Sequence, residues 1–167
     1  MFCFVEGQDD ETFLKHILLR SENITFYQFA KKTCAQVNKL INALNSMNEQ
    51  YLFSADSDGN DIFEKRRKVL TKFPGVSQTA LVIVQYEIES WFLAGVSDTF
   101  SAAYHFKKYY RATDFVTKEM FLDCISLARD TKLNIMLKIL DQYDCLLAKT
   151  RNNSFASFYR DYHNICI

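Results

Sequence analysis

The sequence predicts an α/β fold in which a mostly parallel, four-stranded sheet is flanked by helices and followed by a helical C-terminal region. In the first half of the chain, short apolar runs alternate with segments of helical periodicity, which is typical of parallel strands joined by right-handed crossovers. A length of 167 residues is enough for one domain with a full core. The apolar fraction of 49% and the aromatic fraction of 15% exclude a disordered chain.

Three of the predicted strands are short apolar runs that end at turn residues or acids, and the second is an alternating, β-rich segment. The first run stops at Glu6-Gly7, as a buried strand entering a turn does, and the last is the most apolar of the four. We place the strands at residues 2–5, 24–29, 51–55 and 80–86.

Helical spacing of apolar residues fills the gaps between these strands. The first helix follows Asp9 and Asp10, either of which can cap it, and the second lies around residues 37–44. The third is strongly basic, spans residues 62–73 and is closed by Pro74-Gly75.

From about Asp98 onward the pattern is helical, and the sequence contains no repeat and no low-complexity stretch. We therefore expect one domain over residues 1–167. Its α/β core covers residues 1–95, and residues 96–167 form a helical extension packed on that core.

Charge and cysteine content limit the function classes. Twenty basic and twenty acidic side chains cancel, so the chain lacks the global positive field of an autonomous nucleic-acid binder, although a local basic patch is compatible with this balance. Five cysteines without a C-x-x-C pair favour free, buried thiols over zinc sites or disulfides. The first residues do not form a signal peptide, and no apolar run approaches the length of a membrane span. We expect a cytoplasmic protein without a membrane partner.

Acidic residues follow three of the four predicted strands. Glu6 comes after the first strand, Asp56 and Asp58 after the third, and Glu87 and Glu89 after the fourth. Because the carboxyl ends of parallel strands share one edge of a sheet, we expect these acids to gather there. In an extended segment, residues two apart also point to the same side.

Crowded carboxylates repel one another unless cations or protons neutralise them. Their hard oxygen donors suit Mg²⁺ or Mn²⁺, so the sequence predicts a divalent-metal site formed by Glu6, Asp56, Asp58 and one or both of Glu87 and Glu89. The alternative is that such acids only cap helices, a role open to Asp56 or Asp58 before the helix at Ile62.

Three segments carry a resemblance to a known family. Residues 4–14 resemble the first motif of Toprim domains, an apolar strand ending in Glu-Gly before a helix. Residues 52–58 resemble the second motif, an apolar strand ending in Asp-x-Asp. Residues 86–94 resemble small stand-alone Toprim-like proteins related to nucleases of the overcoming-lysogenization-defect type. The resemblance covers about the first 95 residues and implies a Toprim-like fold.

The resemblance also implies an activity. Glu6 would act as general acid/base or metal ligand, Asp56 and Asp58 would hold Mg²⁺, and Glu87 or Glu89 would complete the coordination. The implied reaction is metal-dependent cleavage of phosphodiesters, in DNA in preference to RNA, by the chain alone, as a homo-oligomer, or with a separately encoded ATPase. The chain departs from many such nucleases in carrying no ATPase domain, and no tyrosine stands out for strand passage.

Other functions are compatible with the same residues. A non-catalytic interaction subunit of a nucleic-acid-processing or defence complex would keep the fold and the acids without turnover. The loop at Asp56-x-Asp58 also resembles the nucleophile loop of haloacid-dehalogenase-type phosphatases, but that family places the loop on its first strand. An EF-hand is excluded because Asp61 occupies the loop position that requires glycine.

Two basic segments are candidates for contact with nucleic acid. Lys65, Arg66, Arg67 and Lys68 follow the acidic loop and could approach phosphates, or they could form a solvated helix face. Residues 107–111 mix cations with aromatic rings, as single-strand binders do, but the end of an amphipathic helix is the favoured interpretation.

Overall fold

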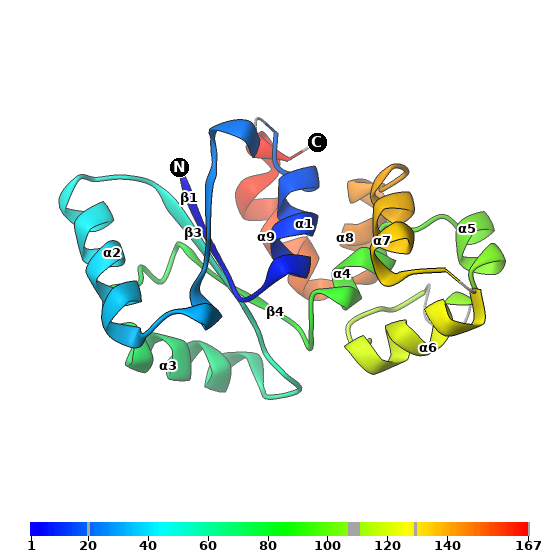
Figure 1. Ribbon diagram of the computed structural model, residues 1–167, viewed down its shortest axis with the longest axis horizontal. Helices are drawn as coiled ribbons and strands as arrows, with labels where there is room; N and C mark the ends of the chain where they lie inside the picture. The colour runs from blue at the N-terminus through cyan, green and yellow to red at the C-terminus, as the bar shows by residue number, and fades with distance from the viewer. Residues whose placement is uncertain (20, 107–110, 129, 167) are drawn as a thin grey trace. The chain divides into compact units, whose positions relative to one another are not determined.

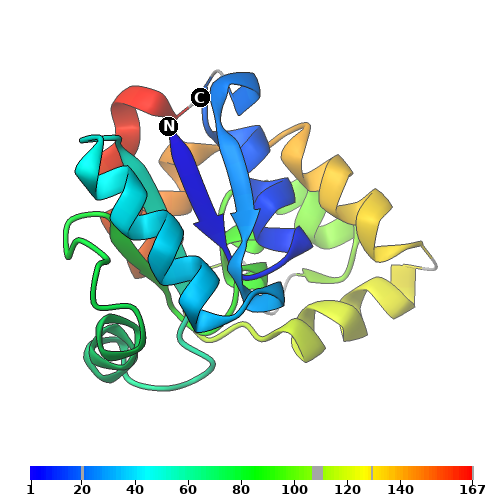
Figure 2. The ribbon, with the colours of Figure 1, turned by 60° about the vertical axis from the view of Figure 1, so that its left-hand side comes forward.

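The predicted α/β fold is confirmed by a four-stranded, all-parallel sheet with the strand order β2-β1-β3-β4. The computed structural model describes residues 1–19, 21–106, 111–128 and 130–166 (Figure 1). The strands are β1 (Phe2–Val5), β2 (Thr25–Gln28), β3 (Tyr51–Asp56) and β4 (Leu81–Val84). Figure 2 shows β1 and β2 side by side, with Phe2 paired to Thr25 and Val5 to Gln28.

The chain divides into two compact units, Met1–Ile83 and Val84–Ile167. The first contains the sheet, whose last strand ends at the boundary, together with α1 (Gln8–Ile17), α2 (Cys34–Ser46) and α3 (Ile62–Lys72). The prediction of a single domain over residues 1–167, with a core over 1–95, stays a prediction.

Three strands differ in length from the prediction: β2 is shorter by one residue at each end, and the differences in β3 and β4 affect the acids. The third strand continues through Asp56, which is therefore its last residue. The fourth strand ends at Val84 instead of residue 86. Tyr86 has a φ of 60°, which takes the backbone out of the extended conformation before Glu87 is reached.

Side chains of the sheet alternate between two apolar layers in the first unit. Phe4 and Phe53, which are partners in the β1–β3 register, contribute to one buried cluster with residues of α2 and α3, including Ile41 and Val69. Cys3 and Leu52 are the neighbouring register pair, and they are also fully buried. Figure 1 shows α2 and α3 on one side of the sheet and α1 on the other. Burial on both faces explains why β1 and β4 are continuous apolar runs, whereas β2, which is partly exposed, is not.

Local hydrogen bonds define where the helices of this unit begin. α1 begins at Gln8 with Gly7 as its N-cap residue, so neither Asp9 nor Asp10 precedes the helix as the predicted cap; Asp10 lies in the first turn, where its Oδ2 accepts from the backbone N–H of Gly7 at 3.1 Å. At α3, the carboxylate of Asp61 accepts from the backbone N–H groups of Phe63 and Glu64, at 2.9 and 3.1 Å. An N-cap side chain such as that of Asp61 stabilises a helix by roughly 1 kcal/mol.

The second unit is helical in its described residues, as predicted for the C-terminal region. Its helices are α4 (Glu89–Ala94), α5 (Asp98–Ala103), α6 (Lys118–Ala128), α7 (Lys132–Leu140), α8 (Cys145–Arg151) and α9 (Asn153–Tyr162). Trp91 is fully buried, and its indole N–H donates to Ser154 Oγ at 2.7 Å. Asn152 accepts from the N–H of Phe155 and caps α9. The basic and aromatic residues 107–110 lie outside the described residues.

The cysteines agree with the prediction of free thiols. Cys3, Cys124, Cys145 and Cys166 are buried, whereas Cys34 is exposed at the start of α2, so burial was predicted wrongly for that residue. In the part of the chain that the structure describes, no helix is long and apolar enough to cross a membrane.

Candidate functional site

The candidate site lies where the connections of the sheet reverse direction. From β1 the chain crosses to β2 on one side, then returns past β1 to β3 on the other side. In open parallel sheets, ligands bind beyond the carboxyl ends of the strands at such a point. Glu6 directly follows β1, and Asp56 ends β3, which is the strand next to β1. The prediction that acids from these two strands share one edge is therefore confirmed by the parallel pairing.

A lysine from α3 lies between the acids of this edge. The ammonium of Lys65 is 2.7 Å from Asp58 Oδ2 and 3.8 Å from Glu6 Oε1. Its side chain is only 16% exposed, whereas the side chain of Asp58 is 56% exposed. One cation thus approaches carboxylates from both strand ends, which shows that the negative potential of this edge attracts positive charge.

The surroundings of Glu6 shift the pKa of its carboxyl group. Burial raises the pKa of its carboxyl group, and the nearby charge of Asp58 adds to the rise. Lys65, a hydrogen bond from the backbone of Asp56 and the charge of Lys72 act in the opposite direction without cancelling the effect. The raised pKa places proton exchange at Glu6 nearer to neutral pH, as a general acid/base requires.

The raised pKa of Glu6 has a consequence for stability. The native state binds this proton more readily than the unfolded chain, so the stabilisation by Glu6 is present at low pH and is lost as pH rises through the folded-state pKa. Without metal, we expect Glu6→Gln to raise the melting temperature at neutral pH, with a gain that shrinks as pH falls below the ordinary carboxyl pKa. Thermal melts of both proteins across pH measure this, and Glu49→Gln, at an exposed position, is the control. A gain that grows toward acid would contradict the prediction.

Asp56 and Asp58 occupy different environments, contrary to the extended spacing predicted for them. Asp56 is buried at the end of β3, and Ser57 after it is also buried. Asp58 has a φ of 51° and Gly59 a φ of 74°, so the chain turns sharply and carries the Asp58 carboxylate outward. The cap of α3 is Asp61, so capping that helix does not explain either Asp56 or Asp58.

The acids predicted from the fourth strand lie in the second unit and have partners there. Glu87 accepts a hydrogen bond from the backbone N–H of Lys118 at the start of α6. Glu89 begins α4 and is buried, and its carboxylate lies 2.6 Å from the ammonium of Lys132. In these contacts Glu87 and Glu89 act as a helix cap and as one half of a buried ion pair, and their contribution to a metal site stays a prediction.

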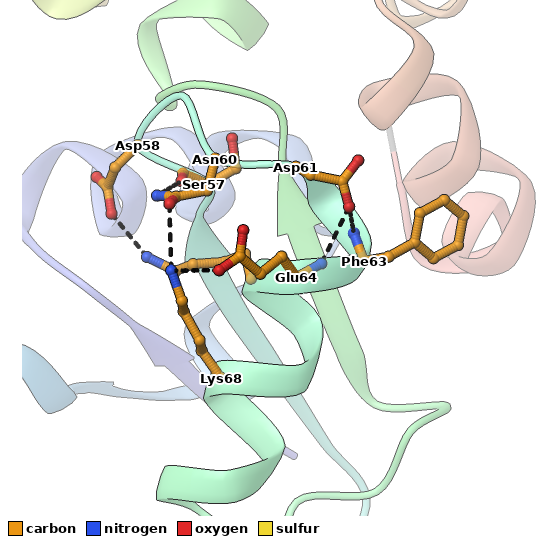
Figure 3. A network of polar contacts seen from close by, with 8 residues as sticks. Ser57, Asp58, Asn60, Asp61, Phe63, Glu64 and Lys68 are labelled. Carbon is orange, nitrogen blue, oxygen red and sulfur yellow. Dashed lines mark hydrogen bonds and ion pairs between the residues drawn. The ribbon is translucent and has the colours of Figure 1, made fainter.

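The basic run of α3 separates into two pairs with different surroundings. Lys65 and Lys68 are engaged with acids, Lys68 at 2.9 Å from Glu64, and Lys68 also donates to Asn60 (Figure 3). The guanidinium of Arg66 donates to the backbone carbonyls of Gln78 and Leu81, at 3.0 and 2.9 Å. Arg67 is exposed. Contact between these residues and nucleic acid stays a prediction.

No family model, curated protein or solved structure matches this chain. The Toprim resemblance therefore rests on the motifs of the sequence and on their positions in the sheet.

The donor chemistry of the edge fits a hard divalent cation. Glu6, Asp56 and Asp58 offer carboxylate oxygens only, and the ammonium of Lys65 already lies against two of them. In the described residues, however, no three Asp, Glu, His or Cys side chains are arranged as a ready metal-binding group. A metal would thus have to replace Lys65 beside Asp58.

The sequence indicated either phosphate contact or a solvated helix face for Lys65, and it did not predict that Lys65 lies among the acids. The signal was its position seven residues after Asp58, on the first turns of a helix that starts beside the acidic loop. The sequence pattern indicated no role for Phe63. Its position in the first turn of α3, directly before the charged run that starts at Glu64, was the signal that its ring is exposed.

Proposed function

We propose that the protein is a divalent-metal-dependent phosphodiesterase of Toprim type that acts on nucleic acid, DNA in preference to RNA. The observation that carries the proposal is the position of Glu6 and Asp56 at the carboxyl ends of the neighbouring strands β1 and β3. From β1 the chain connects to β2 on one side, and it then returns to β3 on the other side. The loop after Asp56 brings Asp58 close enough to Glu6 for one ammonium to lie against both carboxylates.

Each residue of this edge has a role in the proposed reaction. Asp56 and Asp58 would hold Mg²⁺ or Mn²⁺, which would supply an activated water and neutralise the leaving oxygen. Glu6 would either join them as a metal ligand or exchange a proton with the reacting group, and the raised pKa of its carboxyl group favours proton exchange. Lys65 forms an ion pair with Asp58 in the absence of metal, and a divalent cation would take its place beside that carboxylate.

Metal binding can be tested by thermal stability. A ligand bound only by the native state raises its melting temperature, by about 5–10 °C for a protein of this size at a metal concentration near 100 times Kd. We expect Mn²⁺ or Mg²⁺ to produce such a shift in the wild type and not in the Asp56→Asn/Asp58→Asn double variant. The measurement is a melt with and without metal, with Asp9→Asn/Glu11→Gln as a charge-matched control from the same unit. Equal shifts in the wild type and the double variant would remove these residues from the site.

Turnover is tested with supercoiled plasmid, single-stranded DNA and structured RNA in either metal. The protein is assayed alone and with a co-encoded ATPase, which is the partner that the resemblance implies. We place this activity in the cytoplasm. Absence of cleavage of all three substrates by folded, metal-loaded protein would contradict the proposal.

A non-catalytic interaction subunit is the second candidate, and two observations favour it. The ammonium of Lys65 already lies against two carboxylates of the edge, and the described residues contain no ready group of three metal ligands. Such a subunit would show neither a metal-induced rise in melting temperature nor cleavage.

A further inference from the structure

The outward side of α3 forms a groove with an unusual combination of side chains. The groove has a volume of about 380 Å³, which falls in the range of small-ligand clefts. We call it the α3 groove, and its lining residues are Phe63, Arg66, Arg67, Leu70, Thr71 and Gln78. All of them belong to the first unit.

Phe63 is the most solvent-exposed of the large apolar side chains that the structure describes on the surface, at 80%. Its backbone N–H is held by Asp61, so the first turn of α3 fixes the base of this side chain. Figure 3 shows its ring pointing away from the polar network around Asp58 and Lys68. Proteins that bind single strands stack nucleobases on exposed aromatic rings of this kind.

The two arginines of the groove supply positive charge that no nearby acid neutralises. In contrast to Lys65 and Lys68, neither Arg66 nor Arg67 forms an ion pair within the described part of the chain. The contacts of Arg66 are neutral carbonyls, which fix its guanidinium but leave its charge. Guanidinium groups of this kind recognise phosphates through paired hydrogen bonds.

We propose that the α3 groove docks single-stranded nucleic acid, with a base stacked on Phe63 and the adjacent phosphate held by Arg67. The inference rests on the proposed function, because it names the form in which the substrate is held. A second copy of this chain is a poor occupant, since a two-fold contact would bring the arginines of both copies together. A flat, anionic ligand matches both the exposed ring and the unneutralised charge.

The contribution of the ring is measured by fluorescence anisotropy with a labelled single-stranded oligonucleotide of about 16 nucleotides, without metal. Phe63→Leu keeps an apolar side chain and removes the stacking face, and we expect affinity to fall about tenfold. Phe63→Trp retains an aromatic face and should bind at least as tightly as the wild type. If Leu and Trp at this position bind equally well, the ring does not stack on a base and the proposal is wrong.

The contribution of charge is measured by the salt dependence of the same binding. Arg67→Gln should weaken binding and reduce the slope of log K against log salt by about 0.7, the value for one phosphate contact on a single strand. Lys39→Gln, at an exposed position of α2, removes the same charge from the same unit and should leave the slope unchanged. Equal slopes for wild type and Arg67→Gln would overturn the assignment of Arg67.

These measurements separate the two proposals. Binding that depends on Phe63 and Arg67 without any cleavage would support the groove and contradict the nuclease. Cleavage that persists with unchanged single-strand affinity in Phe63→Leu and Arg67→Gln would support the nuclease and overturn the groove. Failure of the wild type to bind the single strand, or preference for a duplex that ignores Phe63, would also overturn it, and a protein partner would then be the occupant to consider.

Discussion

We expect Glu6→Gln to lower metal-dependent cleavage by about two to four orders of magnitude, the usual effect of losing a positioned general acid/base. Glu6 follows β1 at the point where the strand connections change side, between β1 and β3. Burial raises the pKa of its carboxyl group. Glutamine has nearly the same shape but neither exchanges the proton nor carries the charge. The measurement is the cleavage rate in Mn²⁺ and in Mg²⁺ on the substrate that the wild type cuts best.

The control for this prediction must separate loss of chemistry from loss of fold. Glu49→Gln makes the same replacement at an exposed position of the first unit and should cleave as the wild type does. Circular dichroism and thermal melts should show Glu6→Gln folded and, without metal at neutral pH, more stable than the wild type. Wild-type rates in Glu6→Gln would mean that the activity arises at another site or from a contaminant.

The largest effect on stability is expected for Phe53→Ala. Phe53 is fully buried in β3. The centroid of its ring lies 4.6 Å from the ring centroid of Phe29 and 5.4 Å from those of Phe4 and Phe73. Truncation removes the apolar contacts and leaves a cavity, which together cost about 3–5 kcal/mol for a buried phenylalanine. Urea denaturation followed by circular dichroism measures the change in the free energy of unfolding.

Phe63→Ala is the matched control because it deletes the same ring from a side chain that is 80% exposed. A surface substitution of this kind should change the free energy of unfolding by no more than about 0.5 kcal/mol. Phe53→Leu should lie between the two, since it retains much of the apolar volume. Similar losses for Phe53→Ala and Phe63→Ala would contradict the assignment of Phe53 to the core.

Two details of the fold could not be predicted from the sequence pattern, because they depend on how the backbone turns in the folded protein. The bounds of β4 illustrate this, because residues 80–86 remain apolar or neutral while Tyr86 adopts a left-handed conformation that ends the strand early. The helix cap is a second example. Asp56, Asp58 and Asp61 all precede the helix at Ile62, and only the folded loop shows that Asp61 meets its backbone N–H groups.

The sequence by itself determined the fold class and the approximate positions of the strands. Strands buried on both faces are mostly apolar along their length, whereas helices need only one apolar stripe, so the two patterns are distinguishable without a structure. It also placed Glu6 and Asp56 at the carboxyl ends of two strands, and parallel pairing then required them to share an edge. Only the tertiary structure showed that β1 and β3 are neighbours and that Lys65 lies between Glu6 and Asp58. Strand order and ion pairing bring together residues that are distant along the chain. The free energy of packing depends on all of these residues together, and it selects one arrangement.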